Sequence, residues 1–285
     1  ITGNISSGAQ SISATGNITE VAGGTSISVT AAGPQTITAG GTLTVQGGAT
    51  GTNNFAQIVS SANQTIIASG ITITGGGGTS NFAEIAQNGT SASQTINVTG
   101  GGTLALNGGS GGANNFAQIR NQSVSQQINF TSGGKLAITG GTGVSNDFAQ
   151  VTANNGTQTI SGSPTIGLTG GTGGLPDQGN NAQIRAVSGP QFITAGNTSI
   201  IAGASGFTNA AVILSPVQAI TIHGDLTLNG GGSASSALRA GSARIGGLAA
   251  DTPTPTNLVL TVDGNVGMTG GTAANAGATI GAGFL

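Results

Sequence analysis

Apolar and polar residues alternate along short stretches of the chain, and these stretches recur about every thirty residues. The phrase TNNFAQI at residues 52–58 returns as TSNFAEI, ANNFAQI and SNDFAQV. Aligning the chain on this phrase gives a column of alanines, followed two residues later by a column of Ile or Val. The alanines are Ala56, Ala83, Ala117, Ala149, Ala182, Ala211, Ala243 and Ala278, and the aliphatic residues are Ile58, Ile85, Ile119, Val151, Ile184, Ile213, Ile245 and Ile280. Successive alanines are 27 to 35 residues apart, which indicates about eight repeats.

Two further alternating stretches complete each repeat. One begins with glutamine, as in QTITAGG and QTINVTG, and the other follows a glycine turn, as in GTLTVQGG and GTLALNGG. No segment has the i, i+3, i+4 pattern of an amphipathic helix. About three short strands in each ~30-residue coil, stacked coil upon coil, are typical of a single-stranded parallel β-helix, or β-solenoid. The sequence therefore predicts an all-β rod in which each strand pairs with its counterpart one coil away.

The spacing divides the chain into three ranges. Residues 1–33 have shorter spacings and are expected to form smaller N-terminal coils, residues 34–250 the main repeats, and residues 251–285 a C-terminal coil and tail. We find no amphipathic helix and no group of lysines that would cover the strand edges at either end. Uncovered edges predict either a piece of a longer rod or subunits that stack head to tail, which builds a filament.

The glutamines that begin one stretch of each repeat are candidate structural residues. They are Gln35, Gln64, Gln94, Gln126 and Gln158, and the column continues as Gln191 and Gln218. Gln35 shares a side of its strand with Ile37, so these amides can point inward near a corner and bond coil to coil as a ladder. In the alternative, the alternation breaks at the corner and the glutamines face water. A buried amide without a partner is costly, so a buried column requires the ladder.

The phenylalanines of the recurring phrase are a second set of candidate structural residues. They are Phe55, Phe82, Phe116 and Phe148. If the alanine and aliphatic columns fill the core, these rings point outward, stack one coil apart and form an association surface. In the alternative, they lie at a corner and tuck into the core. The column becomes Asn181 in the next repeat, so any stack covers only the first half of the chain.

Composition narrows the class of protein. The chain has 285 residues, 55 of them glycine, only 4% charged residues, a net charge of −2 and no cysteine. Regular Ile, Val and Thr with little net charge argue against disorder, and the absence of a Gly-X-Y period excludes collagen. No apolar run is long enough to span a membrane as a helix. Five basic residues scattered along the chain are too few for nucleic-acid binding.

The few ionisable residues do not predict an enzyme, a metal site or a cofactor site. His223 lies two residues before Asp225 at a turn, without a nucleophile nearby, and is expected to face solvent. Arg120 and Arg185 each follow the aliphatic column and have no acidic counterpart that the sequence reveals. Paired carboxylates across a cleft, which glycoside hydrolysis needs, are not evident. Aromatic platforms of Trp or Tyr, which bind sugars, are absent.

The phrases ISATGNIT and QTITAGGTLTV, with the glycine-bounded repeats, resemble the filamentous-haemagglutinin-like adhesins that bacteria export by two-partner secretion. The resemblance covers essentially the whole chain and lies in the style of the repeat. It implies a right-handed β-helix, a place outside the cell or on the outer surface of a bacterium, and a role in adhesion or biofilm. We therefore expect a non-enzymatic structural protein whose partners are copies of itself and a host surface or polysaccharide. The alternative is a β-helix that binds or cleaves polysaccharide.

Overall fold

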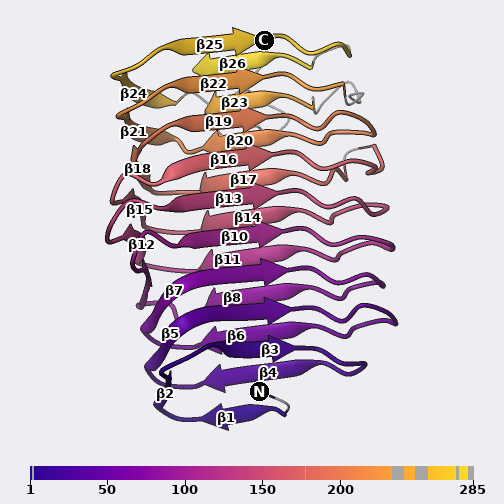
Figure 1. The fold of residues 1–285 in the computed structure, drawn as a ribbon, viewed down its shortest axis with the longest axis vertical. Coiled ribbons are helices and arrows are strands. Elements are labelled where there is room, and N and C mark those ends of the chain that lie inside the picture. Colours follow the sequence, from indigo (N-terminus) through magenta and orange to yellow (C-terminus); the bar gives the residue numbers. More distant parts are fainter. Residues whose placement is uncertain (2, 177, 233–240, 248–255, 274–275, 282–285) are drawn as a thin grey trace.

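The computed structural model describes residues 1, 3–176, 178–232, 241–247, 256–273 and 276–281. These residues form parallel strands that are joined by turns and loops and stacked in successive coils, and none of the described residues is helical (Figure 1). The prediction of an all-β parallel β-solenoid is confirmed. No described segment is a helix able to cross a membrane. Strands of all three sequence ranges belong to the same two sheets, and residues 251–255, 274–275 and 282–285 of the third range lie outside the described residues.

Each coil contributes strands to three faces of the rod. Face 1 holds β1 (Ile5–Ser7), β4 (Ile27–Ala31), β6 (Ala56–Ser60), β8 (Ala83–Gln87), β11 (Ala117–Asn121), β14 (Ala149–Ala153), β17 (Ala182–Ala186), β20 (Ala211–Leu214), β23 (Ala243–Gly246) and β26 (Ala278–Gly281). Face 2 holds β2 (Gln10–Ala14), the first part of β5 (Gln35–Gln46) and of β7 (Gln64–Thr74), β9 (Ser93–Val98), β12 (Ser125–Phe130), β15 (Thr157–Ser161), β18 (Pro190–Ala195), β21 (Val217–Ile222) and β24 (Asn257–Val262). Face 3 holds β3 (Ile18–Val21), the second part of β5 and β7, β10 (Thr103–Asn107), β13 (Lys135–Thr139), β16 (Thr165–Thr169), β19 (Thr198–Ile201), β22 (Leu226–Asn229) and β25 (Val266–Thr269).

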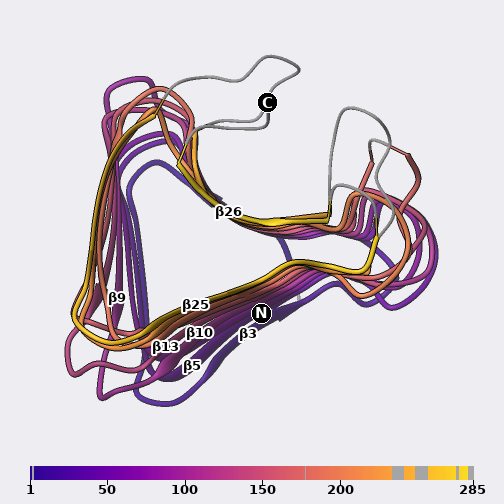
Figure 2. The ribbon, with the colours of Figure 1, turned by 90° about the horizontal axis from the view of Figure 1, so that it is seen from above.

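The three faces enclose a roughly triangular core (Figure 2). Seen from above, with the C-terminal coils nearer the viewer, the chain passes counter-clockwise from β9 through β10 to face 1. A chain that turns counter-clockwise while it rises toward the viewer forms a right-handed helix, which is the hand that the resemblance implied.

Identical columns run through the core because the strands pair in register. Ala83, Ala117 and Ala149 are partners in neighbouring coils of face 1, and the aliphatic column beside them is paired in the same way. The predicted columns Ala56, Ala83, Ala117 and Ala149 and Ile58, Ile85, Ile119 and Val151 are all fully buried. Alternation along each strand thus places the small and the branched side chains inside the rod.

Two coils lack the glycine turn that the sequence predicted between faces 2 and 3. β5 and β7 run through this corner as single strands, and the pairing between them shifts register between Ala39 and Thr42. In the next coil Gly100 and Gly101 adopt positive φ angles of 63° and 71°, and the strand is interrupted there. A short corner can bend within one strand, whereas the longer corner needs left-handed glycines and forms a turn.

A glycine-rich lobe extends from the corner between face 3 and face 1, at the right of Figure 2. The segments that form it in successive coils are 47–54, 75–81, 108–115, 140–147, 170–180 and 203–209. Its two arms lie backbone against backbone, since Gly109 N–H donates to Asn115 O at 2.6 Å and Gly141 N–H donates to Asp147 O at 2.6 Å. A Cβ on Gly108 would collide with Asp147 O. Only glycine permits this close approach.

Candidate functional site: ladders of stacked side chains

A continuous glutamine ladder runs along the inner corner between face 1 and face 2. Each Nε2 donates to the Oε1 of the glutamine one coil earlier, over distances of 2.6 to 2.9 Å. The ladder consists of Gln10, Gln35, Gln64, Gln94, Gln126, Gln158, Gln191 and Gln218. From Gln35 onward every member is at most 1% exposed. The structure therefore places the five predicted glutamines inside the rod and bonds them coil to coil.

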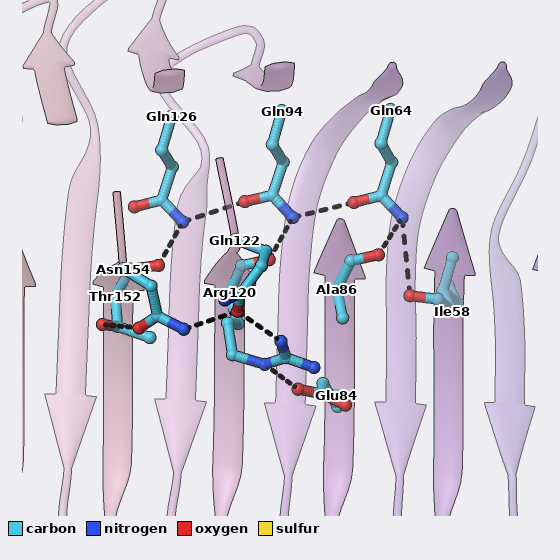
Figure 3. Close-up of polar contacts among 10 residues, drawn as sticks. All are labelled: Ile58, Gln64, Glu84, Ala86, Gln94, Arg120, Gln122, Gln126, Thr152 and Asn154. Carbon is cyan, nitrogen blue, oxygen red and sulfur yellow. Dashed lines mark hydrogen bonds and ion pairs between the residues drawn. The ribbon is translucent and has the colours of Figure 1, made fainter. Parts of the chain in front are cut away.

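The second amide hydrogen of these glutamines holds face 1 against face 2. Gln64 Nε2 donates to the Ala86 carbonyl at 3.1 Å, and Gln126 Nε2 donates to the Thr152 carbonyl at 3.1 Å (Figure 3). Both carbonyls belong to strands of face 1, whereas the glutamines begin strands of face 2. Gln35, Gln64, Gln94, Gln126 and Gln158 each make such a bond and so cross-link two faces of the rod.

The two ends of the glutamine ladder each leave one buried atom without a hydrogen-bond partner. At the N-terminal end this atom is Gln10 Nε2, and at the C-terminal end it is Gln218 Oε1. The residue that pairs with Gln218 in the next coil is Leu258, which has no donor to offer. The ladder is therefore directional, with a free donor at its first rung and a free acceptor at its last.

A second ladder lies where the glycine-rich lobe meets face 1, and the sequence analysis did not single it out. It consists of Asn54, Asn81, Asn115, Asp147, Asn180 and Asn209. The backbone N–H of each of the first five residues donates to the side-chain Oδ1 one coil later, over 2.6 to 2.9 Å. The asparagine Nδ2 atoms donate to backbone carbonyls of the lobe. This asparagine ladder ties the lobe to the coil.

The recurring phrase already contained the signal for the asparagine ladder. In each of its four copies the residue before phenylalanine is Asn or Asp. The residue before that has a positive φ, 60° at Asn53 and 63° at Asn114. Asn tolerates this left-handed conformation better than most residues. Asn and Asp are common in such turns, so their recurrence alone did not reveal the bond between coils.

The four predicted phenylalanines form a stack on the outside of face 1. Ring centroids of Phe55 and Phe82, Phe82 and Phe116, and Phe116 and Phe148 are 4.8, 4.7 and 4.9 Å apart, with interplanar angles of 5°. The rings are half-buried and alternate with the buried alanines, so they do not enter the core. Each interior ring has both of its faces covered by neighbouring rings, so only its edge can reach solvent. A sugar ring needs an open aromatic face, so the interior rings offer no such platform.

Polar side chains also interact across coils on the outer surface of face 1. Arg120 Nε lies 2.9 Å from Glu84 Oε1, and Arg120 Nη1 donates to Gln122 Oε1 at 3.3 Å (Figure 3). The statement that Arg120 has no acidic counterpart is therefore wrong. The register explains the error, because Glu84 pairs with Gln118, two residues before Arg120, and the contact is diagonal. The pair is partly exposed and contributes little to stability.

The remaining candidate groups form no catalytic arrangement among the described residues. His223 Nδ1 lies 2.8 Å from Asp263 Oδ2 in the next coil, with 47% and 54% of the two side chains exposed. Asp225 accepts the backbone N–H of Asn265 at 2.8 Å and so belongs to a turn. The described part of the chain contains no group of three His, Cys, Asp or Glu side chains that could hold a metal ion. Comparisons with family models, curated proteins and solved structures gave no match to the chain.

One acid lies inside the first coils, at a position of β3 that the alternation assigns to an apolar residue. Glu20 is fully buried, and its Oε1 accepts the Gln57 backbone N–H at 3.1 Å. Its Oε2 has no partner. Burial raises the pKa of Glu20 to about 8, and the hydrogen bond from Gln57 opposes this shift. At neutral pH Glu20 is therefore mainly a neutral acid.

Proposed function

We propose that the chain is a non-enzymatic structural protein whose β-solenoids stack end to end into a filament or an adhesin shaft outside the cell. The observation that carries the proposal is the exposure of apolar side chains where the core columns end. One column of face 1 begins with Ile5 and ends with Ile280, and one column of face 3 begins with Ile18 and ends with Val266. Between these ends the columns are closely packed and largely buried.

Apolar side chains are open at the N-terminal end of the face 1 column and at the C-terminal end of face 3, whereas Ile18 is only 6% exposed. Ile5 is 38% exposed, and Val266 and Met268 are 52% and 46% exposed, although their partners Leu226 and Leu228 are fully buried. Exposed apolar side chains next to unpaired strand edges favour pairing with another chain. A second copy that continues the register would place apolar residues on apolar residues in both columns. Low charge supports close contact between copies, because their mutual repulsion is weak.

The location outside the cell and the adhesive role rest on the resemblance of the repeats to filamentous-haemagglutinin-like adhesins. The ladders support a structural role, since they bond each coil to the next along most of the rod. The stacked phenylalanines give no support to the alternative of a polysaccharide-binding or polysaccharide-cleaving protein, because the interior rings have no free face.

The proposal is tested by changing one end of the rod. Val266→Lys places a charge on the open end of the column that begins with Ile18, whereas Val259→Lys changes an outward-facing residue of β24 that is 66% exposed. In sedimentation velocity the unchanged chain and V259K are expected to form long assemblies, and V266K is expected to remain monomeric. Monomers of the unchanged chain, or equal assembly of V266K, would overturn end-to-end stacking.

A further inference from the structure

The asparagine ladder contains a single acid. Asp147 occupies the rung between Asn115 and Asn180 and is fully buried. Its Oδ1 does what the asparagine Oδ1 atoms do, since it accepts the Asn115 backbone N–H at 2.6 Å. Its Oδ2 stands where an asparagine carries Nδ2, and this oxygen is buried without a hydrogen-bond partner.

The neighbouring rungs show which atom this position normally faces. In the coil before, the Gly78 carbonyl accepts both the Gly112 backbone N–H at 3.0 Å and Asn115 Nδ2 at 2.6 Å. In the coil after, the Gly143 carbonyl accepts Asn180 Nδ2 at 3.0 Å. In both rungs the ladder side chain donates to a glycine carbonyl of the preceding coil. The position therefore calls for a donor.

The corresponding carbonyl near Asp147 is that of Gly112. It accepts the Val144 backbone N–H at 3.1 Å, which is the counterpart of the contact that Gly78 makes in the coil before. A Cβ on Gly143 would collide with Asp147 Oδ2 and lie 2.7 Å from the Gly112 carbonyl oxygen. Both oxygens thus face one small space. Two oxygens facing each other without a hydrogen between them repel, and burial strengthens the repulsion.

Burial and hydrogen bonds from Asn115, and no charged side chain, are the causes of the shifted pKa of Asp147. The charged side chains on the described strands packed around it are Glu84, Arg120, Lys135 and Arg185. The first two form a pair on the outer surface of face 1. Burial raises the pKa of Asp147 to about 6, against the hydrogen bonds from Asn115 that lower it.

We propose that the folded solenoid holds Asp147 as a neutral carboxylic acid whose Oδ2–H donates to the Gly112 carbonyl oxygen. The proton then replaces the amide hydrogen that the five asparagines supply in the other rungs. Loss of the proton leaves the two oxygens opposed and loosens the lobe segment 140–147 beside Phe148, the last ring of the phenylalanine stack. The middle of the rod thereby becomes sensitive to pH.

The direction of the pH effect follows from the raised pKa. The contribution of Asp147 to stability is fully present below its unfolded pKa of 3.8 and is lost as the pH rises through about 6. A shift of about two pKa units weakens the folding equilibrium on the order of 100-fold once the carboxyl group is ionised.

The matched variant is Asp147→Asn, which makes this rung identical in chemistry to its neighbours. Folding equilibria of D147N and the unchanged protein are compared by urea denaturation from about pH 4 to pH 8. We expect equal stability at the acid end and an advantage for D147N on the order of 100-fold at the alkaline end. Both proteins share Glu20, so their difference isolates Asp147. A constant difference, or a less stable D147N at pH 8, overturns the proposal.

The reverse variant transfers the acid to a neighbouring rung. Asn115→Asp removes the donor to the Gly78 carbonyl and is expected to add a second pH dependence of the same sign and similar size. The Asp147 carboxyl carbon, followed by NMR, is expected to titrate near pH 6. A midpoint near 4 would overturn the proposal. So would stabilisation by millimolar calcium chloride of the unchanged protein but not of D147N, because a bound cation would then hold the carboxylate ionised.

Discussion

Replacement of Gln126 by leucine breaks the glutamine ladder at its centre. Gln126 donates to Gln94 Oε1 at 2.9 Å and to the Thr152 carbonyl at 3.1 Å, and it accepts from Gln158 Nε2 at 2.7 Å. Leucine fills a similar volume, so the main loss is polar. Gln94 Oε1 is left buried without its donor, which costs about 1–3 kcal/mol, and the other two bonds add about 0.5–1.5 kcal/mol each. We expect Gln126→Leu to lower the free energy of unfolding by about 2–6 kcal/mol.

Gln218→Leu is the matched control at the end of the same ladder. Gln218 Oε1 already lacks a partner, and the next coil presents Leu258 at this position. The substitution leaves Gln191 Oε1 without its donor and removes a bond to the Ile213 carbonyl. It also removes the unsatisfied oxygen of Gln218 itself, which offsets the orphaned oxygen of Gln191, and it adds an apolar contact to Leu258. We expect a cost of about 0–2 kcal/mol.

The assay for both variants is urea denaturation followed by far-UV circular dichroism. Fluorescence is not an option, because the chain has neither Trp nor Tyr. The variants are compared at one pH so that Asp147 and Glu20 contribute equally. If Gln126→Leu costs no more than Gln218→Leu, the rungs do not stabilise one another, and the reasoning about the ladder is refuted.

Two further substitutions test other parts of the rod. Phe116→Ala removes two of the three ring contacts, each worth about 0.5–1.5 kcal/mol. It is expected to lower the melting temperature more than the control Phe192→Ala, because the Phe192 ring is 45% exposed and its partners in the neighbouring coils are Thr159 and Ala219. Equal shifts in melting temperature would count against a stabilising role of the stack. Glu20→Gln is expected to leave stability unchanged near pH 4 and to raise it at pH 9. The reason is that the contribution of Glu20 to the free energy of unfolding is lost as the pH rises from its unfolded pKa of 4.5 through its folded pKa of about 8. Each unit of difference between these two pKa values corresponds to about 1.4 kcal/mol. If the difference in urea midpoint between E20Q and the unchanged protein does not change with pH, this prediction is contradicted.

The period-two alternation and the ~30-residue repeat were sufficient to predict the solenoid. Inward residues such as Ala83 and Ile85 recur with fixed spacing from their phrase, so their pairing in register follows from the alignment alone. The glutamine and phenylalanine columns could be located in the same way. Their orientation could not, because alternation does not say which way a side chain points at a corner. Gln35 turned inward where its amide could reach both the next rung and a carbonyl of face 1.

Features that depend on contacts between coils were less accessible from the sequence. The Arg120–Glu84 pair is diagonal across two strands, so a column-by-column alignment does not bring the two residues together. The role of Asp147 depends on a glycine carbonyl of the previous coil, and loop lengths in the lobe vary too much for the sequence to place that carbonyl. Glu20 occupies an inward position of β3 that pairs with Val45, which alternation alone would assign to an apolar residue.

The central claim is that copies of the chain continue the solenoid end to end, and cryo-electron microscopy of the purified protein tests it most directly. Ten strands of face 1, about 4.8 Å apart, give an axial repeat of about 48 Å for each subunit. We expect uniform fibres with this repeat and with β1 of one copy next to β26 of another. Single particles, or fibres whose repeat bears no relation to this length, would contradict it.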